Sequence, residues 1–258
     1  MRSHVPSYEL VVARDLPHAL SMLTEGFRPI AGGTDVMVLF EAGKLAHKKW
    51  MSIRGLPELR TIDVTPDHIT FGALTTYTDV RRSAIIAAEF PLMIEAAALT
   101  GGIATQNRGT IGGNIVNASP AADTPPALLV YDAEVELTSP RGSRWVPYTQ
   151  FHKGYKVMDL ASDELLTRIR LPRKFASWTH FYRKVGTRRA QAISKVCFAG
   201  VRRGDQMRVA LGSVGPAPIF LENSDISAIS PIDDVRSTAR YRMQVAKNLM
   251  EEFLHASA

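Results

Sequence analysis

The stretch Asn107–Leu129, NRGTIGGNIVNASPAADTPPALL, decides how the rest of the chain is interpreted. Its first part, RGTIGGN, combines three glycines with a threonine and an asparagine, and Pro29–Val36, PIAGGTDV, repeats the device with two glycines. Glycine adopts positive φ and lets backbone N–H groups converge on an anion, while a hydroxyl group and the start of a helix add attraction for negative charge. Two separate cradles of this kind predict a pyrophosphate ligand.

Each loop also has a purely structural interpretation. A tight strand-to-helix turn needs glycine for its shape alone, and for Pro29–Val36 the residues favour both interpretations equally. Neither loop has the GxxxxGK[ST] or GxGxxG spacing of the common nucleotide folds. Asp123, just before Pro125-Pro126, is either an N-cap of the next helix or a ligand contact. At Gly113 a β-branched side chain is expected to block both close approach and positive φ.

Around these loops, short strands alternate with helices. Apolar alternation bounded by turn residues predicts the strands, and helical periodicity predicts the helices. The chain is expected to begin with strand Tyr8–Val12, a helix capped by Asp15 and stopped at Gly26, strand Arg28–Ala31 and a brief helix. Further strands are predicted at Trp50–Ile53, Thr61–Val64, Ile69–Ala73, Ala133–Thr138, Arg144–Val146 and Leu165–Leu171, and further helices around Thr78, at Pro91 and at Pro125.

The segment Arg173–Ser177 is the predicted domain boundary. Beyond it the pattern predicts strands Thr179–Val185, Ala192–Arg202 and Met207–Val214, and then a long helix over Ile232–Leu254. The expected buried face of that helix comprises Val235, Ala239, Ala246, Leu249 and Phe253.

Composition excludes several classes of protein. With 258 residues, 45% hydrophobic and 22% charged, the chain has the composition of a globular protein, unlike collagenous or disordered chains. The net charge of +6 fits a nucleic-acid binder, but the basic residues are scattered and no aromatic stacking platform accompanies them. A single cysteine, Cys197, cannot build a disulfide, a structural zinc site or an iron-sulfur cluster, so we expect no metal and a reducing cytoplasm. No apolar segment predicts export or a membrane span.

The residues of the two loops carry a family resemblance. AGGTDV at Ala31–Val36 together with Asn107–Leu129 resembles the FAD-binding medium subunit of the molybdenum hydroxylases, the family of xanthine dehydrogenase and carbon monoxide dehydrogenase flavoprotein subunits. The likeness continues through DELLTRIRLP at Asp163–Pro172, FYRKVGTRRAQAIS at Phe181–Ser194 and the pair Tyr241-Arg242. It covers nearly the whole chain.

This resemblance implies the fold and the domain organisation. The fold would be α+β, of the PCMH type, with an FAD-binding domain over residues 1–173 and a smaller C-terminal αβ domain over 174–258. Within the first domain, two α+β subdomains, about 1–54 and 55–173, would hold FAD between them. Two glycine cradles on two subdomains are consistent with that arrangement.

The resemblance also implies which residues contact the cofactor. Asp123, Leu166 and Lys184 match family positions that touch FAD; from the residues alone, Leu166 would be a core leucine and Lys184 a solvated lysine. The positions implied around the pyrophosphate are Pro29, Ile30, Ala31, Gly32, Gly33, Thr34, Asp35 and Val36, with Thr110, Ile111, Gly112, Gly113 and Asn114. The family commonly has an acid where this chain has Ala192, so no role is transferred within Thr187–Ile193.

Noncovalent binding of FAD is expected, because the seven histidines and Cys197 all lie outside both glycine loops. Tyr155 and Tyr182 are either aromatic contacts of the cofactor or core residues. No catalytic residue is predicted, since the cofactor performs flavin chemistry and the protein places it.

The implied function is that of an electron-transfer subunit in a cytoplasmic, multi-subunit molybdenum hydroxylase of the xanthine dehydrogenase type. It would take electrons from a small iron-sulfur subunit, which carries the 2Fe-2S clusters, and pass them to NAD or another acceptor. A large molybdopterin subunit would oxidise the substrate, whether a purine, an aldehyde, an N-heterocycle or carbon monoxide. The basic loop Lys184–Arg189 is the expected subunit interface.

Two alternatives remain open from the residues. A stand-alone flavin oxidoreductase of the same fold superfamily would need a proton-transfer cluster in its own substrate domain, and residues 174–258 have no evident one. A non-enzymatic module that binds anions or nucleic acid would purify colourless.

Overall fold

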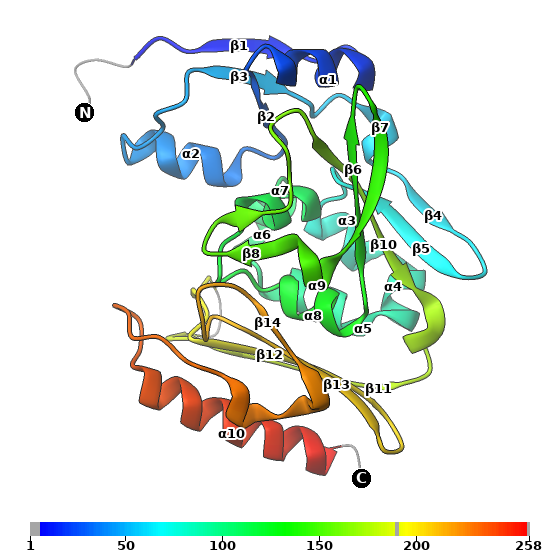
Figure 1. The fold of residues 1–258 in the computed structure, drawn as a ribbon, viewed down its shortest axis with the longest axis vertical. Helices are drawn as coiled ribbons and strands as arrows, with labels where there is room; N and C mark the ends of the chain where they lie inside the picture. Colours follow the sequence, from blue (N-terminus) through cyan, green and yellow to red (C-terminus); the bar gives the residue numbers. More distant parts are fainter. Residues whose placement is uncertain (1–5, 189–190, 257–258) are drawn as a thin grey trace.

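Three sheets follow one another along the longest axis of the computed structural model, which describes residues 6–188 and 191–256 (Figure 1). The N-terminal unit lies at one end, a five-stranded sheet with most of the helices lies in the middle, and a four-stranded sheet with the last helix lies at the other end. The predicted α+β class is confirmed. The predicted divisions at 54/55 and 173/174 stay predictions.

The first sheet is parallel, in the order β1-β3-β2, with β1 over Glu9–Val12, β2 over Arg28–Ile30 and β3 over Lys49–Ser52. Helix α1, Leu16–Thr24, is capped by Asp15, whose Oδ1 accepts a hydrogen bond from the His18 N–H at 2.8 Å. Helix α2, Thr34–Glu41, follows β2 after the three-residue turn Ala31–Gly33. The predicted sequence of strand, capped helix, strand and brief helix is therefore confirmed.

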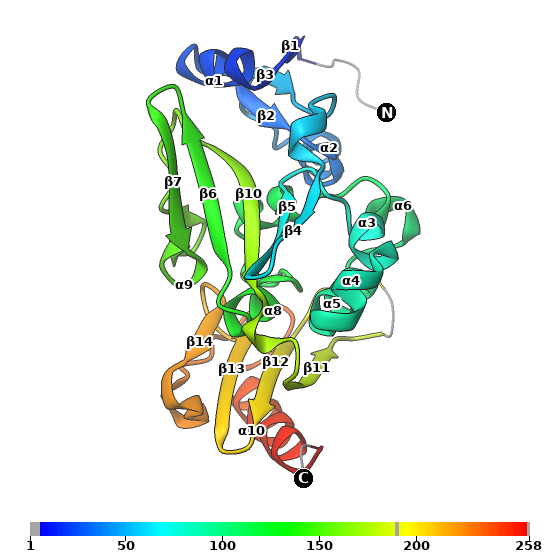
Figure 2. The same ribbon diagram turned by 90° about the vertical axis from the view of Figure 1, so that its right-hand side faces the viewer.

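The middle sheet is antiparallel around its central strand. Its order is β4 (Ile62–Val64), β5 (His68–Gly72), β10 (Leu165–Pro172), β6 (Glu134–Ser139) and β7 (Gly142–Pro147). The two predicted strands pair as the hairpin β6–β7, which turns at residues 140–141. Figure 2 shows α3 to α6 gathered on one side of β5 and β10.

Short helices and a small hairpin complete the middle unit. The helices are η1 (Pro57–Leu59), α3 (Tyr77–Arg82), α4 (Ala84–Glu89), α5 (Pro91–Leu99), α6 (Ile103–Gln106), α7 (Ile111–Asn117), α8 (Pro125–Val130) and α9 (Tyr148–Phe151). The hairpin strands are β8 (His152–Gly154) and β9 (Val157–Met158). Apolar side chains of α5, α7 and α8 pack with the inward-facing residues of β5, β6 and β10 in the largest core.

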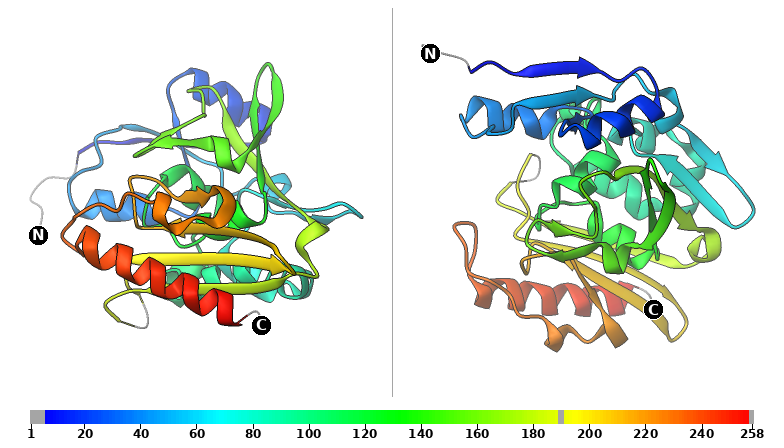
Figure 3. Two further views of the ribbon diagram at one scale, coloured as in Figure 1. Left: turned by 60° about the horizontal axis from the view of Figure 1, so that its bottom comes forward. Right: turned by 45° about the horizontal axis from the view of Figure 1, so that its top comes forward.

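The last sheet runs β11 (Thr179–Val185), β12 (Val196–Arg203), β13 (Gln206–Gly212) and β14 (Ile219–Leu221), all antiparallel, with η2 (Arg173–Phe175) before it. Side chains alternate along a strand, so Phe198 faces α10 while Cys197 and Ala199 face the middle unit. Figure 3 shows α10, Ala239–Ala256, lying along the outer face of this sheet. Two short turns, η3 (Glu222–Ser224) and η4 (Ile226–Ala228), lead to it.

The predicted start of the last helix is wrong. Helix α10 begins at Ala239 instead of Ile232, and Val235, expected on its buried face, is fully exposed. The Asp234 carboxylate accepts hydrogen bonds from the N–H groups of Arg236 and Ser237, which makes a turn in place of the first helical turns. The predicted burial of Ala246, Leu249 and Phe253 is confirmed. Strand β12 begins at Val196, whereas the sequence predicted a start at Ala192.

Candidate functional site: a cleft between the first two units

A cleft of about 870 Å³ lies between the N-terminal unit and the middle unit. The turn from β2 into α2 forms one wall, the first residues of α7 form the second, and the segment 156–166 forms the third. The volume lies within the range of sites for small molecules and cofactors, roughly 300–1,000 Å³. The two glycine loops singled out in the sequence therefore face the same space.

Direct contact joins the two glycine loops. A Cβ atom placed on Gly32 would overlap the backbone carbonyl oxygen of Arg108. The Arg108 Nε in turn donates a hydrogen bond to the Gly32 carbonyl at 3.4 Å, and Asn117 Nδ2 donates to Asp35 Oδ1 at 3.2 Å. Only glycine fits at position 32, because the second loop fills the volume of any side chain.

The glycines serve different purposes. Gly33 has φ of 76° and is the N-cap of α2, so it occupies the left-handed region that favours glycine. Gly32 and Gly113 do not have positive φ, which corrects that part of the prediction. Gly113 lies in α7 and donates its N–H to Thr110 Oγ1 at 3.0 Å, and a Cβ there would lie 2.9 Å from that oxygen. Gly112 is packed so that a Cβ would lie 2.7 Å from the Ala73 carbonyl oxygen.

Most of the predicted cofactor residues line the cleft. They are Pro29, Ala31, Gly32, Gly33, Thr34, Asp35, Val36, Thr110, Gly112, Gly113, Asn114 and Leu166. Four others do not: Ile30 lies in β2, Ile111 is buried in the core, and Asp123 and Lys184 lie together outside the lining. The Oδ1 atom of Asn114 is buried without a hydrogen-bond partner.

Asp123 and Lys184 form a buried ion pair, with 2.6 Å between Oδ2 and Nζ and each side chain more than nine-tenths buried. Lys184 Nζ also donates to the Leu99 carbonyl at 2.9 Å, and Ser194 Oγ donates to Asp123 Oδ1 at 2.6 Å. Burial raises the pKa of Asp123, and the Lys184 ammonium limits that rise. The interpretation of Asp123 as an N-cap is wrong, because Thr124 holds that position and makes no side-chain cap.

The residues packed around Asp123 also show where Tyr182, Cys197 and Lys184 lie. Tyr182 is a core aromatic whose OH donates to the Asp123 carbonyl at 2.8 Å, whereas Tyr155 is exposed. Burial raises the pKa of the Cys197 thiol, which keeps the thiol protonated beside Tyr182 OH. Lys184 is buried and so cannot belong to an exposed basic interface, and Arg189, the last residue of that predicted loop, lies outside the described residues.

Of the third wall of the cleft, only Leu166 was predicted. Residues 156–166 approach it because Arg144, on β7, holds their second half: its guanidinium makes hydrogen bonds to both Glu164 oxygens at 2.7 and 2.8 Å and to Asp159 Oδ2 at 3.0 Å. A lone arginine in a predicted strand carries no sequence signal for such a contact. Spacing between the partners is 15 and 20 residues, beyond any helical or strand period.

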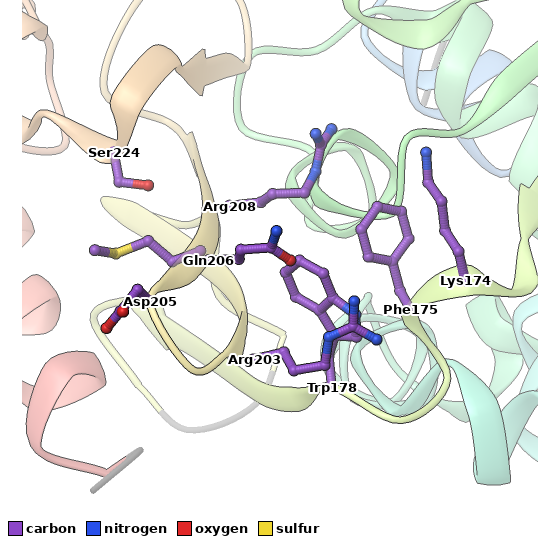
Figure 4. Close-up of a pocket in the computed structure, with 9 residues that line it drawn as sticks. Lys174, Phe175, Trp178, Arg203, Asp205, Gln206, Arg208 and Ser224 are labelled. Carbon is purple, nitrogen blue, oxygen red and sulfur yellow. The ribbon is translucent and has the colours of Figure 1, made fainter.

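A second hollow, of about 650 Å³, lies between the turn after β10 and the β12–β13 hairpin (Figure 4). Its cations are largely engaged in joining these segments. Lys174 Nζ pairs with Asp132 at 2.8 Å, and Arg208 donates to the Val130 and Leu129 carbonyls at the end of α8. Arg203 stacks on Trp178. We therefore interpret this hollow as part of the interface between the middle unit and the last sheet.

Comparison with known proteins defines the class. The chain belongs to the family described as FAD binding domain in molybdopterin dehydrogenase, whose model matches residues 6–174. It is 31% identical over 270 residues to the glyceraldehyde dehydrogenase medium chain of Sulfolobus acidocaldarius, covering 95% of this chain and 96% of that one. It is 32% identical over 227 residues to a putative xanthine dehydrogenase FAD-binding subunit of Escherichia coli K12, covering 84% and 77%.

A solved structure shares the whole fold. The carbon monoxide dehydrogenase of Hydrogenophaga pseudoflava, in a form that lacks the Mo-pyranopterin moiety, matches with a TM-score of 0.92 and 26% identity, covering 98% of both chains. These likenesses confirm the resemblance to medium subunits of molybdenum hydroxylases and the PCMH-type α+β fold. The relatives are components of oxidoreductases.

Proposed function

We propose that the chain binds one FAD noncovalently in the cleft, with the pyrophosphate between Pro29–Val36 and Thr110–Asn114. One observation carries this proposal: the two glycine loops, more than seventy residues apart in sequence, meet at Gly32 and Arg108 and line one cleft. If Gly32 served only the shape of its own turn, the loop that contains Arg108 would not need to pack against it. The start of α2, with Gly33 as its N-cap, faces this cleft, and the N–H groups at the start of a helix suit an anion such as a pyrophosphate.

The residues present fit this cofactor. Both Gly32 and Gly112 line the cleft, and a side chain at either position would collide with the backbone of Arg108 or of Ala73. The walls of the cleft are therefore built from closely packed main chain. The buried Oδ1 of Asn114 has no partner, and a sugar or ribityl hydroxyl of the cofactor can donate a hydrogen bond to it. Leu166 and Tyr77 supply apolar lining. The predicted contacts of Asp123 and Lys184 with FAD stay predictions.

Bound FAD supplies the capacity to accept and release electrons. The chain's own residues bind and orient it: the two loops hold the pyrophosphate, and the segment 156–166, clamped by Arg144, reduces access of water from the third side. The Asp123–Lys184 ion pair joins the loop after α7 to β11 and so holds the last sheet against the middle unit. No residue of the chain needs to act as nucleophile or proton donor.

We further propose that the chain is the electron-transfer subunit of a heteromeric molybdenum hydroxylase. The relatives include proteins named as medium chains and FAD-binding subunits, which supports assembly with other subunits. Electrons would arrive from a small iron-sulfur subunit and leave to NAD or another acceptor, and a large subunit would hold molybdopterin. Cys197, the one cysteine, is buried, so clusters must come from a partner. The cytoplasm remains the predicted compartment; among the residues described, no helix is both long and apolar enough for a membrane span.

Purification without added flavin tests the binding proposal. A yellow protein that releases one FAD per chain on acid precipitation is the expected result. A colourless protein with no affinity for added FAD, or flavin that stays in the precipitate, contradicts it. Substrate oxidation by the lone chain would favour the alternative, a stand-alone flavin oxidoreductase of the same fold superfamily.

A further inference from the structure

The segment 118–123 joins a wall of the cleft to the rest of the chain. It follows α7, whose last residue, Asn117, still lines the cleft. Ala118 turns the chain with φ of 49°, and the Ala122 N–H donates to the Ser119 carbonyl at 3.1 Å. Ordering an irregular segment needs contacts from outside it, because each fixed residue loses conformational entropy. Whatever holds this segment therefore also fixes the end of α7.

The last sheet holds the segment 118–123. The Ser213 N–H, just after β13, donates a hydrogen bond to the Pro120 carbonyl at 2.8 Å. Gly212, the last residue of β13, packs so closely that a Cβ there would lie 3.4 Å from the Ala122 carbonyl oxygen. None of the described residues of the last sheet lines the cleft. The sheet therefore acts on the cleft only through the segments that it supports.

Arg242, near the start of α10, fixes the position of Ser213. The Arg242 side chain is almost fully buried, and its guanidinium donates to the Ser213 carbonyl and, at 2.5 Å, to Asp234 Oδ1. Ser213 has φ of 66°, in the left-handed region that residues with a side chain rarely adopt. Such a backbone persists only where its surroundings hold it. The arginine thus holds the residue whose N–H binds Pro120.

Stability alone does not explain an arginine at this position. The Nε atom of Arg242 and the Oγ atom of Ser213 are both buried without a hydrogen-bond partner. Burying a guanidinium removes its hydration, and an apolar side chain of similar volume often gives equal or greater stability. The distinctive property of arginine is its planar fork, which donates in two fixed directions at once. Here the fork joins the chain just after β13 to the carboxylate that precedes the helix.

We propose that Arg242 is a positioning residue for the cofactor site. Through Ser213 and Pro120 it fixes the segment 118–123, and so the end of α7 that lines the cleft. The proposal rests on the proposed function, because the site it positions is the one assigned to FAD. Figure 1 shows α10 at the end of the molecule away from the N-terminal unit, so the effect travels through the last sheet.

Two variants of α10 separate positioning from stability. Arg242→Met removes both hydrogen bonds and keeps a long side chain in the same space. Leu249→Ala is the control: it removes packing between α10 and the last sheet and leaves the Arg242 hydrogen bonds in place. Fluorescence titration measures the affinity of each flavin-free chain for FAD, and urea unfolding measures stability. Hydrogen exchange of the amides in the segment 118–123, also in the flavin-free chain, measures how firmly that segment is held.

Arg242→Met is expected to bind FAD at least about tenfold more weakly, and the amides of the segment 118–123 to exchange at least about tenfold faster. Leu249→Ala is expected to be less stable to urea, because it leaves a cavity, but to keep the wild-type affinity and exchange rates. Wild-type affinity and exchange in Arg242→Met would overturn the proposal. An equal loss of both in Leu249→Ala would overturn it as well, because general loosening of α10 would then suffice.

A second variant covers the case in which Arg242→Met does not fold. Arg242→Lys keeps the positive charge, but its ammonium cannot hold Ser213 and Asp234 in the way the planar guanidinium does. It is expected to show the same two changes to a smaller extent, and wild-type values for both would overturn the proposal. A wild-type chain without affinity for FAD would instead contradict the proposed function. The exchange measurement needs no flavin, so it would still show whether Arg242 holds the segment 118–123.

Discussion

Gly32 lies directly against the backbone carbonyl of Arg108, so closely that a single added carbon would overlap the carbonyl oxygen. This contact joins the turn of the N-terminal unit to the loop before α7, and the proposed pyrophosphate site lies beside it. Replacement Gly32→Ala is therefore expected to push the loops apart.

We expect Gly32→Ala to weaken FAD binding at least tenfold, about 1.4 kcal/mol or more, because both cradles shift away from their ligand. Fluorescence titration of the flavin-free protein measures this. Gly55→Ala is the control, since nothing lies within 4 Å of a Cβ there and its φ is not positive. Equal affinity of the two variants would show that the loop contact does not shape the site.

Arg144→Ala is expected to weaken FAD binding several-fold while changing the midpoint of thermal unfolding by only a few degrees. Arg144 is partly exposed, so its contacts with Glu164 and Asp159 contribute little to stability, but they hold the third wall in place. Arg141→Ala removes an exposed pair with Asp163, a residue that does not line the cleft, and serves as the control. An unchanged affinity of Arg144→Ala for FAD would show that the segment 156–166 does not contribute to the proposed site.

Lys184→Met is expected to lower the free energy of unfolding by about 3 kcal/mol or more, because it leaves the Asp123 carboxylate buried without its cation. Adding Asp123→Asn should restore part of the loss, so the two substitutions are not additive. Urea unfolding of the two single variants and the double variant measures this coupling. Strict additivity would mean that the pair does not act as a unit.

His152 provides a pH-dependent prediction. Burial lowers the pKa of His152 from 6.5 to about 4, and its Nε2 lies 2.9 Å from Tyr148 OH. Because the folded-state pKa is below the unfolded value, the stabilisation is complete above pH 6.5 and is lost as pH falls towards 4. The loss is up to about 3 kcal/mol, at 1.36 kcal/mol per pKa unit. In His152→Gln, the free energy of unfolding should fall less over that range; parallel curves would contradict this origin.

The sequence by itself determined the local elements and the family. Asp15 caps α1, Gly33 takes the positive φ that begins α2, and alternating residues define β6, because each depends on neighbours within a few positions. The two glycine loops could be recognised for the same reason. Local pattern failed at the last helix, where the side chain of Asp234 competes for backbone N–H groups.

Only the tertiary structure decided how these parts meet. Gly32 contacts Arg108, Lys184 is buried on Asp123, and Arg144 holds Glu164 because sheet pairing and core packing bring them together across 20 to 76 residues. No periodicity of a helix or strand spans such separations. The conformation of a glycine turn is set by its own backbone, whereas the burial of a lysine and the position of a cleft wall depend on which distant segments fill the space around them.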